Sequence, residues 1–226
     1  MLFVNFFELP LFQGIDEVFL EKIFENSILK KSKAKSTIFA EDAREDQCTF
    51  ILKSGIVIIS KTNHLGQETS VDIKYPDDIF GWASFIDKGP RAGTATTVVD
   101  SEYWIINSSN TSLLFKNITF NQNLMIYLTR YIRISEEFIS NAHNNRADEK
   151  VLFQLLRLGV KVDMHTTFIN NKINQTIIAS FAGTSRETVS RVLGQLKKLG
   201  ILKFDQDKNL IINYVEAKKL LNKGLI

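Results

Sequence analysis

The chain has 226 residues, of which 23% are charged, and its formal net charge is +3. This length accommodates two small domains with a core each, whereas so small a net charge excludes a general polyanion-binding protein, so any basic surface must be local. No apolar run reaches the ~18 residues of a membrane span, and the N-terminus lacks the basic flank of a signal peptide, so we expect no membrane partner.

The first half of the chain changes from a helical to a strand pattern. Residues 3–24 predict one or two short helices, with residues 15–24 strongly amphipathic. From residue 28 to about 114 the pattern is one of short alternating runs separated by turn residues. The clearest runs are 49–52, 56–60, 70–74, 94–99 and 103–106. Many short strands at this spacing predict a β-sandwich or jelly roll.

Cysteine and histidine usage excludes several kinds of site. The single cysteine, Cys48, cannot form an internal disulfide or hold an iron–sulfur cluster, and its place beside Phe50 favours a buried apolar role. The three histidines, His64, His143 and His165, have no ligand spacing, so no metal site is predicted. Because only His64 falls within residues 28–118, a jelly-roll enzyme would lack its metal ligands, and we predict no catalytic residues.

A long helical pattern follows from residue 120 to about 142. Its apolar or small residues alternate at steps of four and three, which is typical of a coiled-coil seam and predicts a dimer interface. The alternative is a single amphipathic helix that packs on its own domain. The polar residues 144–148 then form a natural hinge, where Asn145 is a plausible cap for a helix over 149–157. The predicted seam consists of Leu124, Leu128, Tyr131, Ser135, Phe138 and Ala142.

The most specific pattern is helix, glycine turn, helix. Residues 175–182 are apolar-periodic and stop at Gly183, and a second helix is predicted from Arg186 to about residue 199. A short turn between two helices is the architecture that presents its second helix to the DNA major groove. That helix carries an apolar stripe on one side, made of Val189, Val192, Leu193 and Leu196.

Three side chains lie away from that stripe and suit base recognition. Arg186 and Arg191 can each form two hydrogen bonds with guanine, and Glu187 can accept one from cytosine. The alternative reads residues 184–187 (TSRE) as a capping box, in which Glu187 satisfies a free amide and the arginines form a solvated face. Basic residues outnumber the single acid between residues 186 and 203, and residues 200–213 predict the two strands of a wing, which favours DNA binding.

Together these segments resemble the cyclic-AMP receptor and fumarate–nitrate regulator superfamily of transcription factors. The resemblance rests on residues 185–193 (SRETVSRVL) with the following wing, and on four upstream segments in the family's order. These segments are 35–39 (KSTIF), 50–55 (FILKSG), 66–69 (GQET) and 76–81 (PDDIFG). The resemblance covers nearly the whole chain, from about residue 9 to residue 214.

The resemblance implies an α+β fold with three parts. These are a jelly-roll effector domain over residues 1–118, a dimerisation helix over 119–145 and a winged helix-turn-helix over 146–226. It also implies a homodimer that reads palindromic double-stranded DNA and works with RNA polymerase, in a bacterial cytoplasm or a plastid stroma. The implied DNA-contacting residues are Ser185, Arg186, Glu187, Thr188, Ser190 and Arg191.

The expected effector differs from a cyclic nucleotide. Trp82 stands where the cyclic-AMP branch carries its ribose-binding glutamate, and Ala92 replaces the serine that follows the phosphate-binding arginine. The chain is more similar to the cyanobacterial and plastid global nitrogen regulator, which implies a small anion such as 2-oxoglutarate. The alternatives are a constitutive regulator with a degenerate pocket and a cyclic-nucleotide-responsive one. The predicted pocket consists of Phe80, Gly81, Trp82, Arg91, Arg130, Ser135 and Glu136.

Overall fold

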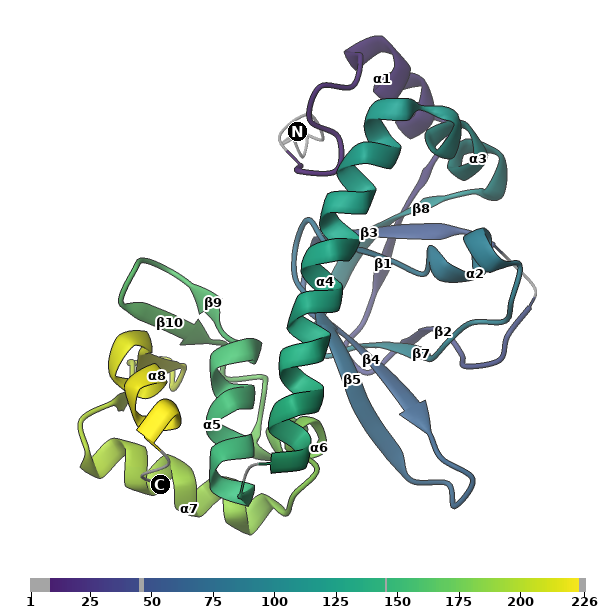
Figure 1. Cartoon of the computed structure of the whole chain (residues 1–226). Helices are drawn as coiled ribbons and strands as arrows, with labels where there is room; N and C mark the ends of the chain where they lie inside the picture. The colour runs from purple at the N-terminus through teal and green to yellow at the C-terminus, as the bar shows by residue number, and fades with distance from the viewer. Residues whose placement is uncertain (1–8, 45–46, 145, 224–226) are drawn as a thin grey trace. The chain divides into compact units, whose positions relative to one another are not determined.

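The structure is a computed structural model that describes residues 9–44, 47–144 and 146–223, without the side chains of residues 137–144 and 222–223. Its internal contacts divide the chain into two units (Figure 1). The first unit contains residues 9–67 and 71–134, and the second contains residues 68–70 and those from 135 onward. The predicted dimerisation helix is therefore divided between the two units.

The first unit contains two four-stranded sheets, with strand orders β1-β8-β3-β6 and β2-β7-β4-β5, apart from residues 68–70 at the start of β5. β8 pairs antiparallel with both β1 and β3, and β7 pairs antiparallel with both β2 and β4. These sheets confirm the predicted β-rich fold. The strands are β1 (Ile28–Ser32), β2 (Thr37–Phe39), β3 (Thr49–Ser54), β4 (Val57–Thr62), β5 (Glu68–Lys74), β6 (Ile79–Phe80), β7 (Thr94–Thr97) and β8 (Ser101–Ile106).

Strand β3 shows how the core is organised. Phe50 and Leu52 face a cluster shared by the two sheets, which includes Val57 of β4 and Tyr103 of β8. Ile51, between them, faces the opposite side and packs in a second cluster with the helices of this unit. Because alternate residues of a strand point to opposite faces, the apolar run of β3 is buried on both sides. This sheet is therefore the central layer of the unit.

Four helices accompany these sheets: α1 (Glu17–Glu25), α2 (Ala83–Asp87), α3 (Ser108–Lys116) and the long α4 (Ile118–Asn144). The amphipathic α1 begins at Asp16, whose side chain accepts a hydrogen bond from the Phe19 amide at 2.9 Å. Its buried face, with Leu20 and Ile23, meets Phe120 of α4 in the helix-side cluster. The first turns of α4 are thus anchored in the core of their own unit.

The apolar face of α4 that the sequence predicts as a dimer seam lies differently in the structure. Leu124 is buried in the helix-side cluster, Leu128 packs against that cluster, and Tyr131 lines a cavity of the first unit. Ser135 is half-buried, and the side chains of Phe138 and Ala142 lie outside those that the structure describes. At Leu124 and Leu128 the predicted face therefore packs on its own domain, whereas Tyr131 is 38% exposed. The exposed apolar residues of α4 are Ile118, Met125, Ile126, Tyr131, Ile132 and Ile134.

The second unit contains the helix pair and its wing. Helices α6 (Gln175–Ala182) and α7 (Arg186–Lys198) have the predicted bounds within a residue, and the predicted wing is the antiparallel pair β11 (Leu202–Phe204) and β12 (Leu210–Asn213). Four further elements surround them: the helices α5 (Ala147–Leu158) and α8 (Tyr214–Lys223), and the strands β9 (Val160–Lys161) and β10 (Thr166–Ile169), which complete a four-stranded sheet. The described helices include none that is long and apolar enough to cross a membrane.

Helix α5 begins differently from the prediction. Arg146 occupies the cap position, and its backbone N–H donates to the Glu149 carboxylate at 3.1 Å. The predicted cap, Asn145, lies outside the described residues. Asp148 falls in the first turn of α5, where the partial positive charge of the helix N-terminus stabilises a carboxylate.

Candidate functional site

The turn between α6 and α7 is built from local hydrogen bonds. Asn174 caps α6 by accepting from the amides of Thr176 and Ile177, at 2.9 and 3.0 Å. Gly183 ends the helix with a φ of +59°, a left-handed conformation that glycine adopts without strain. Ser185 then caps α7, its hydroxyl accepting from the Thr188 amide at 3.2 Å. The turn therefore fixes where α7 starts.

Glu187 is not the partner in a capping box that begins at Thr184. The cap residue is Ser185, so Thr188 occupies the third helical position and Glu187 the second. Hydrogen bonds from its own backbone amide and from the Ser185 hydroxyl hold the pKa of the Glu187 carboxyl below its ordinary value. The side chain is exposed and ionised, which is the state that accepts a hydrogen bond from cytosine N4.

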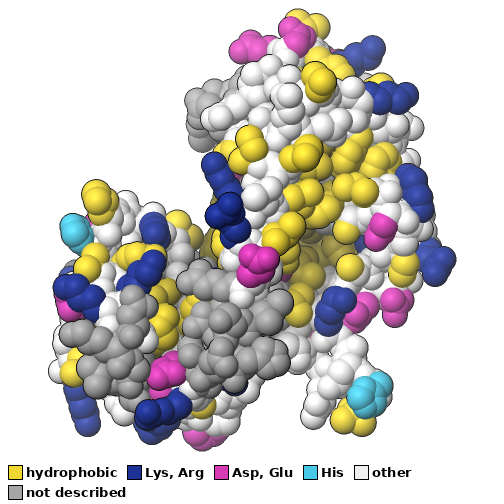
Figure 2. All heavy atoms as spheres, in the orientation of Figure 1, with side chains coloured by type: hydrophobic (Ala, Val, Ile, Leu, Met, Phe, Trp, Pro, Cys, Tyr) yellow, Lys and Arg dark blue, Asp and Glu magenta, His cyan; other side chains and the backbone are white. Residues whose placement is uncertain are grey.

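Helix α7 has one buried and one exposed face. The predicted apolar stripe is buried: Val189, Val192, Leu193 and Leu196. The predicted DNA-contacting residues lie elsewhere, with Ser185, Arg186, Glu187, Ser190 and Arg191 exposed and Thr188 half-buried. Arg186, Glu187, Ser190 and Arg191 line one shallow groove together with Lys198. Several Lys and Arg side chains are visible around the part of the second unit that carries α7 (Figure 2).

One side chain of that exposed face has a partner that sequence reasoning did not find. Asp148, in the first turn of α5, accepts hydrogen bonds from both terminal nitrogens of Arg191, and the Arg191 Nη1–Asp148 Oδ2 distance is 2.9 Å. Arg191 Nη1 also lies 3.4 Å from the Gln195 amide oxygen. The bonds from Arg191 hold the pKa of the Asp148 carboxyl below its ordinary value. Two residues 43 positions apart give no local signal of such a pair.

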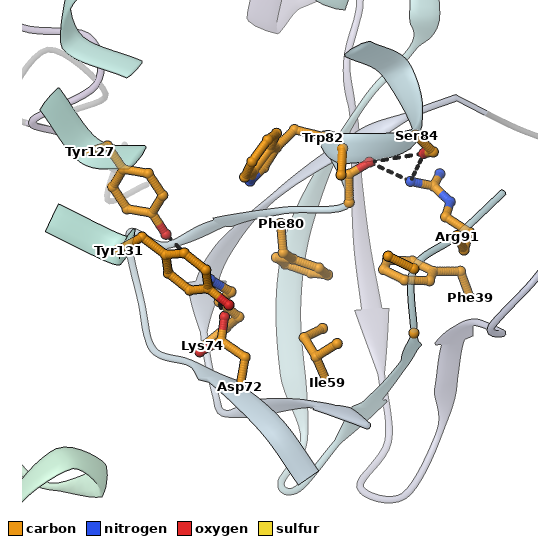
Figure 3. Close-up of a pocket in the computed structure, with 14 residues that line it drawn as sticks. Phe39, Ile59, Asp72, Lys74, Phe80, Trp82, Ser84, Arg91, Tyr127 and Tyr131 are labelled. Atoms are coloured by element: carbon orange, nitrogen blue, oxygen red, sulfur yellow. Dashed lines mark hydrogen bonds and ion pairs between the residues drawn. The ribbon is translucent and has the colours of Figure 1, made fainter. Parts of the chain in front are cut away.

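The first unit contains a cavity of about 240 Å³. Phe80 and Ile59 lie in its middle, with Trp82 beside them, and the charged side chains lie at two opposite ends (Figure 3). Arg91 and Ser84 form one end, while Lys74, Asp72, Tyr127 and Tyr131 form the other.

Arg91 is buried, with an exposed fraction of 2%. Its guanidinium donates to the carbonyl oxygen of Gly81 at 2.5 Å, to that of Cys48 at 3.0 Å and to the Ser84 hydroxyl at 3.1 Å. It also lies over the Phe39 ring, 4.6 Å from the centroid. Gly81 has a φ of +73°, and a Cβ there would come within 2.9 Å of Arg91 Nη1, so glycine is required at this position.

Lys74 lies at the opposite end of the cavity from Arg91. It is 6% exposed and forms an ion pair with Asp72 at 2.9 Å, and its ammonium donates to the Tyr127 hydroxyl at 3.3 Å. Burial opposes the charged form, but Asp72, Tyr127 and Asp78 together outweigh it and hold the pKa of Lys74 above its ordinary value. Burial also raises the pKa of Tyr127, which therefore stays a neutral phenol. Each cation of the cavity thus already has protein partners.

The predicted pocket residues divide into two groups. Phe80, Gly81, Trp82 and Arg91 line the cavity. Arg130 and Glu136 are exposed and Ser135 is half-buried, and none of the three lines it. Helix α4 reaches the cavity through Tyr127 and Tyr131 instead, one turn apart on its inner face.

Sequence reasoning also missed Asp72 and Lys74 as pocket residues. Asp72 and Lys74 carry opposite charges at positions i and i+2 of strand β5, so both side chains point to the same face of the sheet. That spacing was the signal in the sequence from which the pair could have been predicted. Within the described part of the chain, no three His, Cys, Asp or Glu side chains gather as metal ligands.

Comparisons with known proteins agree with this architecture. Residues 29–117 match the cyclic nucleotide-binding domain, and residues 149–217 match the Crp-like helix-turn-helix domain. The cyclic AMP receptor protein of Thermus thermophilus is 30% identical over 158 residues, which cover 70% of this chain and 71% of that protein. A CRP-like cAMP-activated global transcriptional regulator of Mycobacterium tuberculosis is 27% identical, over 77% of this chain and 80% of that protein.

A solved structure supports the same fold. FixK2 from Bradyrhizobium japonicum superimposes with a TM-score of 0.73 at 21% identity, over 86% of this chain and 96% of that one. The fold, the two matched domains and the relatives together define the class of protein: the chain belongs to the Crp/FNR family. It is a DNA-binding transcriptional regulator with an effector-binding domain, and its relatives are regulators rather than enzymes.

Proposed function

We propose that this regulator reads a palindromic DNA site as a homodimer, with the α7 helix of each protomer in the major groove of one half-site. The observation that carries the proposal is the exposed face of α7, where Arg186, Glu187 and Arg191 stand together opposite a fully buried stripe. On this proposal Arg191 binds guanine and Glu187 accepts from cytosine. Arg186 adds a further base contact and Ser190 approaches a thymine methyl, within a TGA-type core.

Selection of binding sites from a random DNA library tests the proposed recognition of a palindromic site. We expect the wild-type protein to return a two-fold symmetric site, with its half-sites about one helical turn apart. Substitution of Arg191 by alanine will weaken binding to that site by about 1–3 kcal/mol, the range for one bidentate base contact. A selected pool with no two-fold symmetry would contradict the proposal.

Dimerisation, on this proposal, uses the outer face of α4. Met125 and Ile132 are exposed in the protomer and stand seven residues apart, so both fall on one side of the helix. Figure 2 shows hydrophobic side chains exposed along the part of the first unit that carries α4. A second copy of the helix would cover them.

For the effector we propose a small anionic metabolite, with 2-oxoglutarate as the compound to try first. The cavity volume of about 240 Å³ lies below the range of ~300–1,000 Å³ for drug-sized ligands, which favours a molecule smaller than a nucleotide. Arg91 is the cation that such an anion would approach. A second candidate is a regulator that needs no ligand, and the partners already held by Arg91 and Lys74 favour it.

Calorimetry separates the two candidates. A metabolite sensor will release heat with 2-oxoglutarate, and Arg91→Ala will abolish that heat while Arg130→Ala, an exposed arginine outside the cavity, will preserve it. Melting curves of both variants show whether each is folded. No heat with any anion, together with unchanged DNA affinity, supports the regulator without a ligand, whereas tight binding of cyclic AMP would contradict both.

A further inference from the structure

The ion pair between Asp148 and Arg191 leaves one edge of the guanidinium open. Asp148 takes the terminal edge, with one carboxylate oxygen on each of the two terminal nitrogens. Gln195 approaches Nη1 only. Among the residues that the structure describes, none accepts from Nε of Arg191, so the edge formed by Nε and Nη2 is available.

That second edge has the geometry of a guanine reader. A guanidinium carries five N–H groups in a planar fork, and two adjacent N–H groups can bind the O6 and N7 atoms of guanine. Because Asp148 occupies only the terminal edge, Arg191 can bind the carboxylate and a guanine at the same time. The carboxylate also restricts the rotation of a long side chain, which reduces the entropy lost when the base is bound.

The pair is also arranged to survive DNA binding. The Asp148 side chain is 16% exposed, so it stays with α5 rather than turning into solvent. If Arg191 released it, a poorly hydrated carboxylate would face the DNA phosphates without its counterion, which is unfavourable. Keeping the pair neutralises that charge at the surface where the backbone of DNA approaches.

We propose that Asp148 is a positioning residue for base recognition, which holds the terminal edge of Arg191 so that its Nε edge reads guanine. The proposal rests on the proposed function, in which Arg191 contacts a base. It makes Asp148 a determinant of sequence specificity although it belongs to a different helix from the base-reading residues.

Binding measurements on the selected site and on sites with that guanine replaced test the role of Asp148. The wild type will discriminate against the replaced base by about 10- to 100-fold, the range for one bidentate contact. Asp148→Asn, which keeps the shape and removes the charge, will reduce that discrimination at least about threefold. Its affinity for random-sequence DNA will be unchanged or higher, because a negative charge has been removed. Asp148→Ser is a second variant that also suits a helix start.

Two controls isolate the contact with Arg191. Asp207→Asn removes an exposed carboxylate from the wing of the same unit and will leave guanine discrimination unchanged. In an Arg191→Ala background, Asp148→Asn will produce no further loss of discrimination.

Three results would overturn the inference. Tighter binding of Asp148→Asn to the selected site with full discrimination would mean that Asp148 restrains Arg191 instead of positioning it. An equal loss of affinity on every sequence, with a lower melting temperature, would mean a purely structural role. Full discrimination with unchanged affinity would mean no role at all. If the wild type itself selects no symmetric guanine, the proposed function fails before any variant is compared.

Discussion

Substituting both Met125 and Ile132 of helix α4 by glutamate is expected to yield a folded monomer that no longer binds its palindromic site specifically. The two side chains are 67% and 56% exposed in the protomer, so glutamate is accommodated there without disturbing the core. In a dimer each would place a charge in an apolar interface, which costs several kcal/mol. A monomer presents a single α7 helix, and losing the second half-site weakens binding by at least about 100-fold.

Light scattering at micromolar concentration and fluorescence anisotropy with the selected DNA measure the two effects. Val18→Glu on α1 is the matched control, because Val18 is 72% exposed on a different helix and its substitution leaves the dimer intact. Leu128→Glu is a less direct test, since Leu128 packs against the core of its own unit and its loss perturbs folding as well. A wild-type protein that scatters as a monomer, or a double variant that remains a dimer, would refute this interface.

The second large effect concerns the buried ion pair of the cavity. Asp72→Asn should destabilise the first unit by about 3 kcal/mol, because Lys74 would remain as a buried ammonium without its nearest carboxylate. The double variant with Lys74→Met removes both charges and should recover most of that stability. Because the pKa of Lys74 is raised, the ion pair contributes its full stabilisation of the folded state at pH values below the ordinary lysine pKa. That stabilisation is lost only in strongly alkaline solution.

Urea unfolding at neutral pH, followed by a probe of the first unit such as tryptophan fluorescence, measures the change. Both Trp82 and Trp104 lie in this unit, which makes the signal specific to it. Lys33 and Asp100 form an exposed pair, so Asp100→Asn is the control and should cost less than about 1 kcal/mol. Equal unfolding midpoints for wild type and Asp72→Asn would show that the buried pair is dispensable.

The parts of the structure that could be predicted are those governed by local chemistry. The predicted helix pair is confirmed. Its boundaries depend on local interactions, because Asn174 caps α6, Gly183 ends it and Ser185 caps α7. The sheet-rich half is confirmed because strand alternation and turn residues need no distant partner. Gly81 and Trp82 line the cavity because the glycine turn between β6 and α2 holds them there.

The parts that could not be predicted depend on contacts between distant segments. The spacing of apolar residues in α4 shows that one face of the helix is apolar. It does not show whether the helix's own domain or a second protomer covers that face, and in the structure Leu124 packs in the core of its own unit. Arg130, Ser135 and Glu136 were assigned to the pocket by resemblance, whereas the α4 residues that line the cavity are Tyr127 and Tyr131. The pairing of Asp148 with Arg191 arises only once α5 and α7 pack together.

Replacement of single guanines by 7-deazaguanine in the selected site tests base reading by α7 most directly. The analogue exchanges the N7 acceptor for C–H and so removes one hydrogen bond to a charged donor, worth about 1.5–3 kcal/mol. We predict that the wild type loses at least about tenfold in affinity at one guanine of each half-site, at symmetric positions, and that Arg191→Ala loses nothing further there. A wild-type protein indifferent to the analogue at every guanine, or an Arg191→Ala variant with the same loss, would contradict the account.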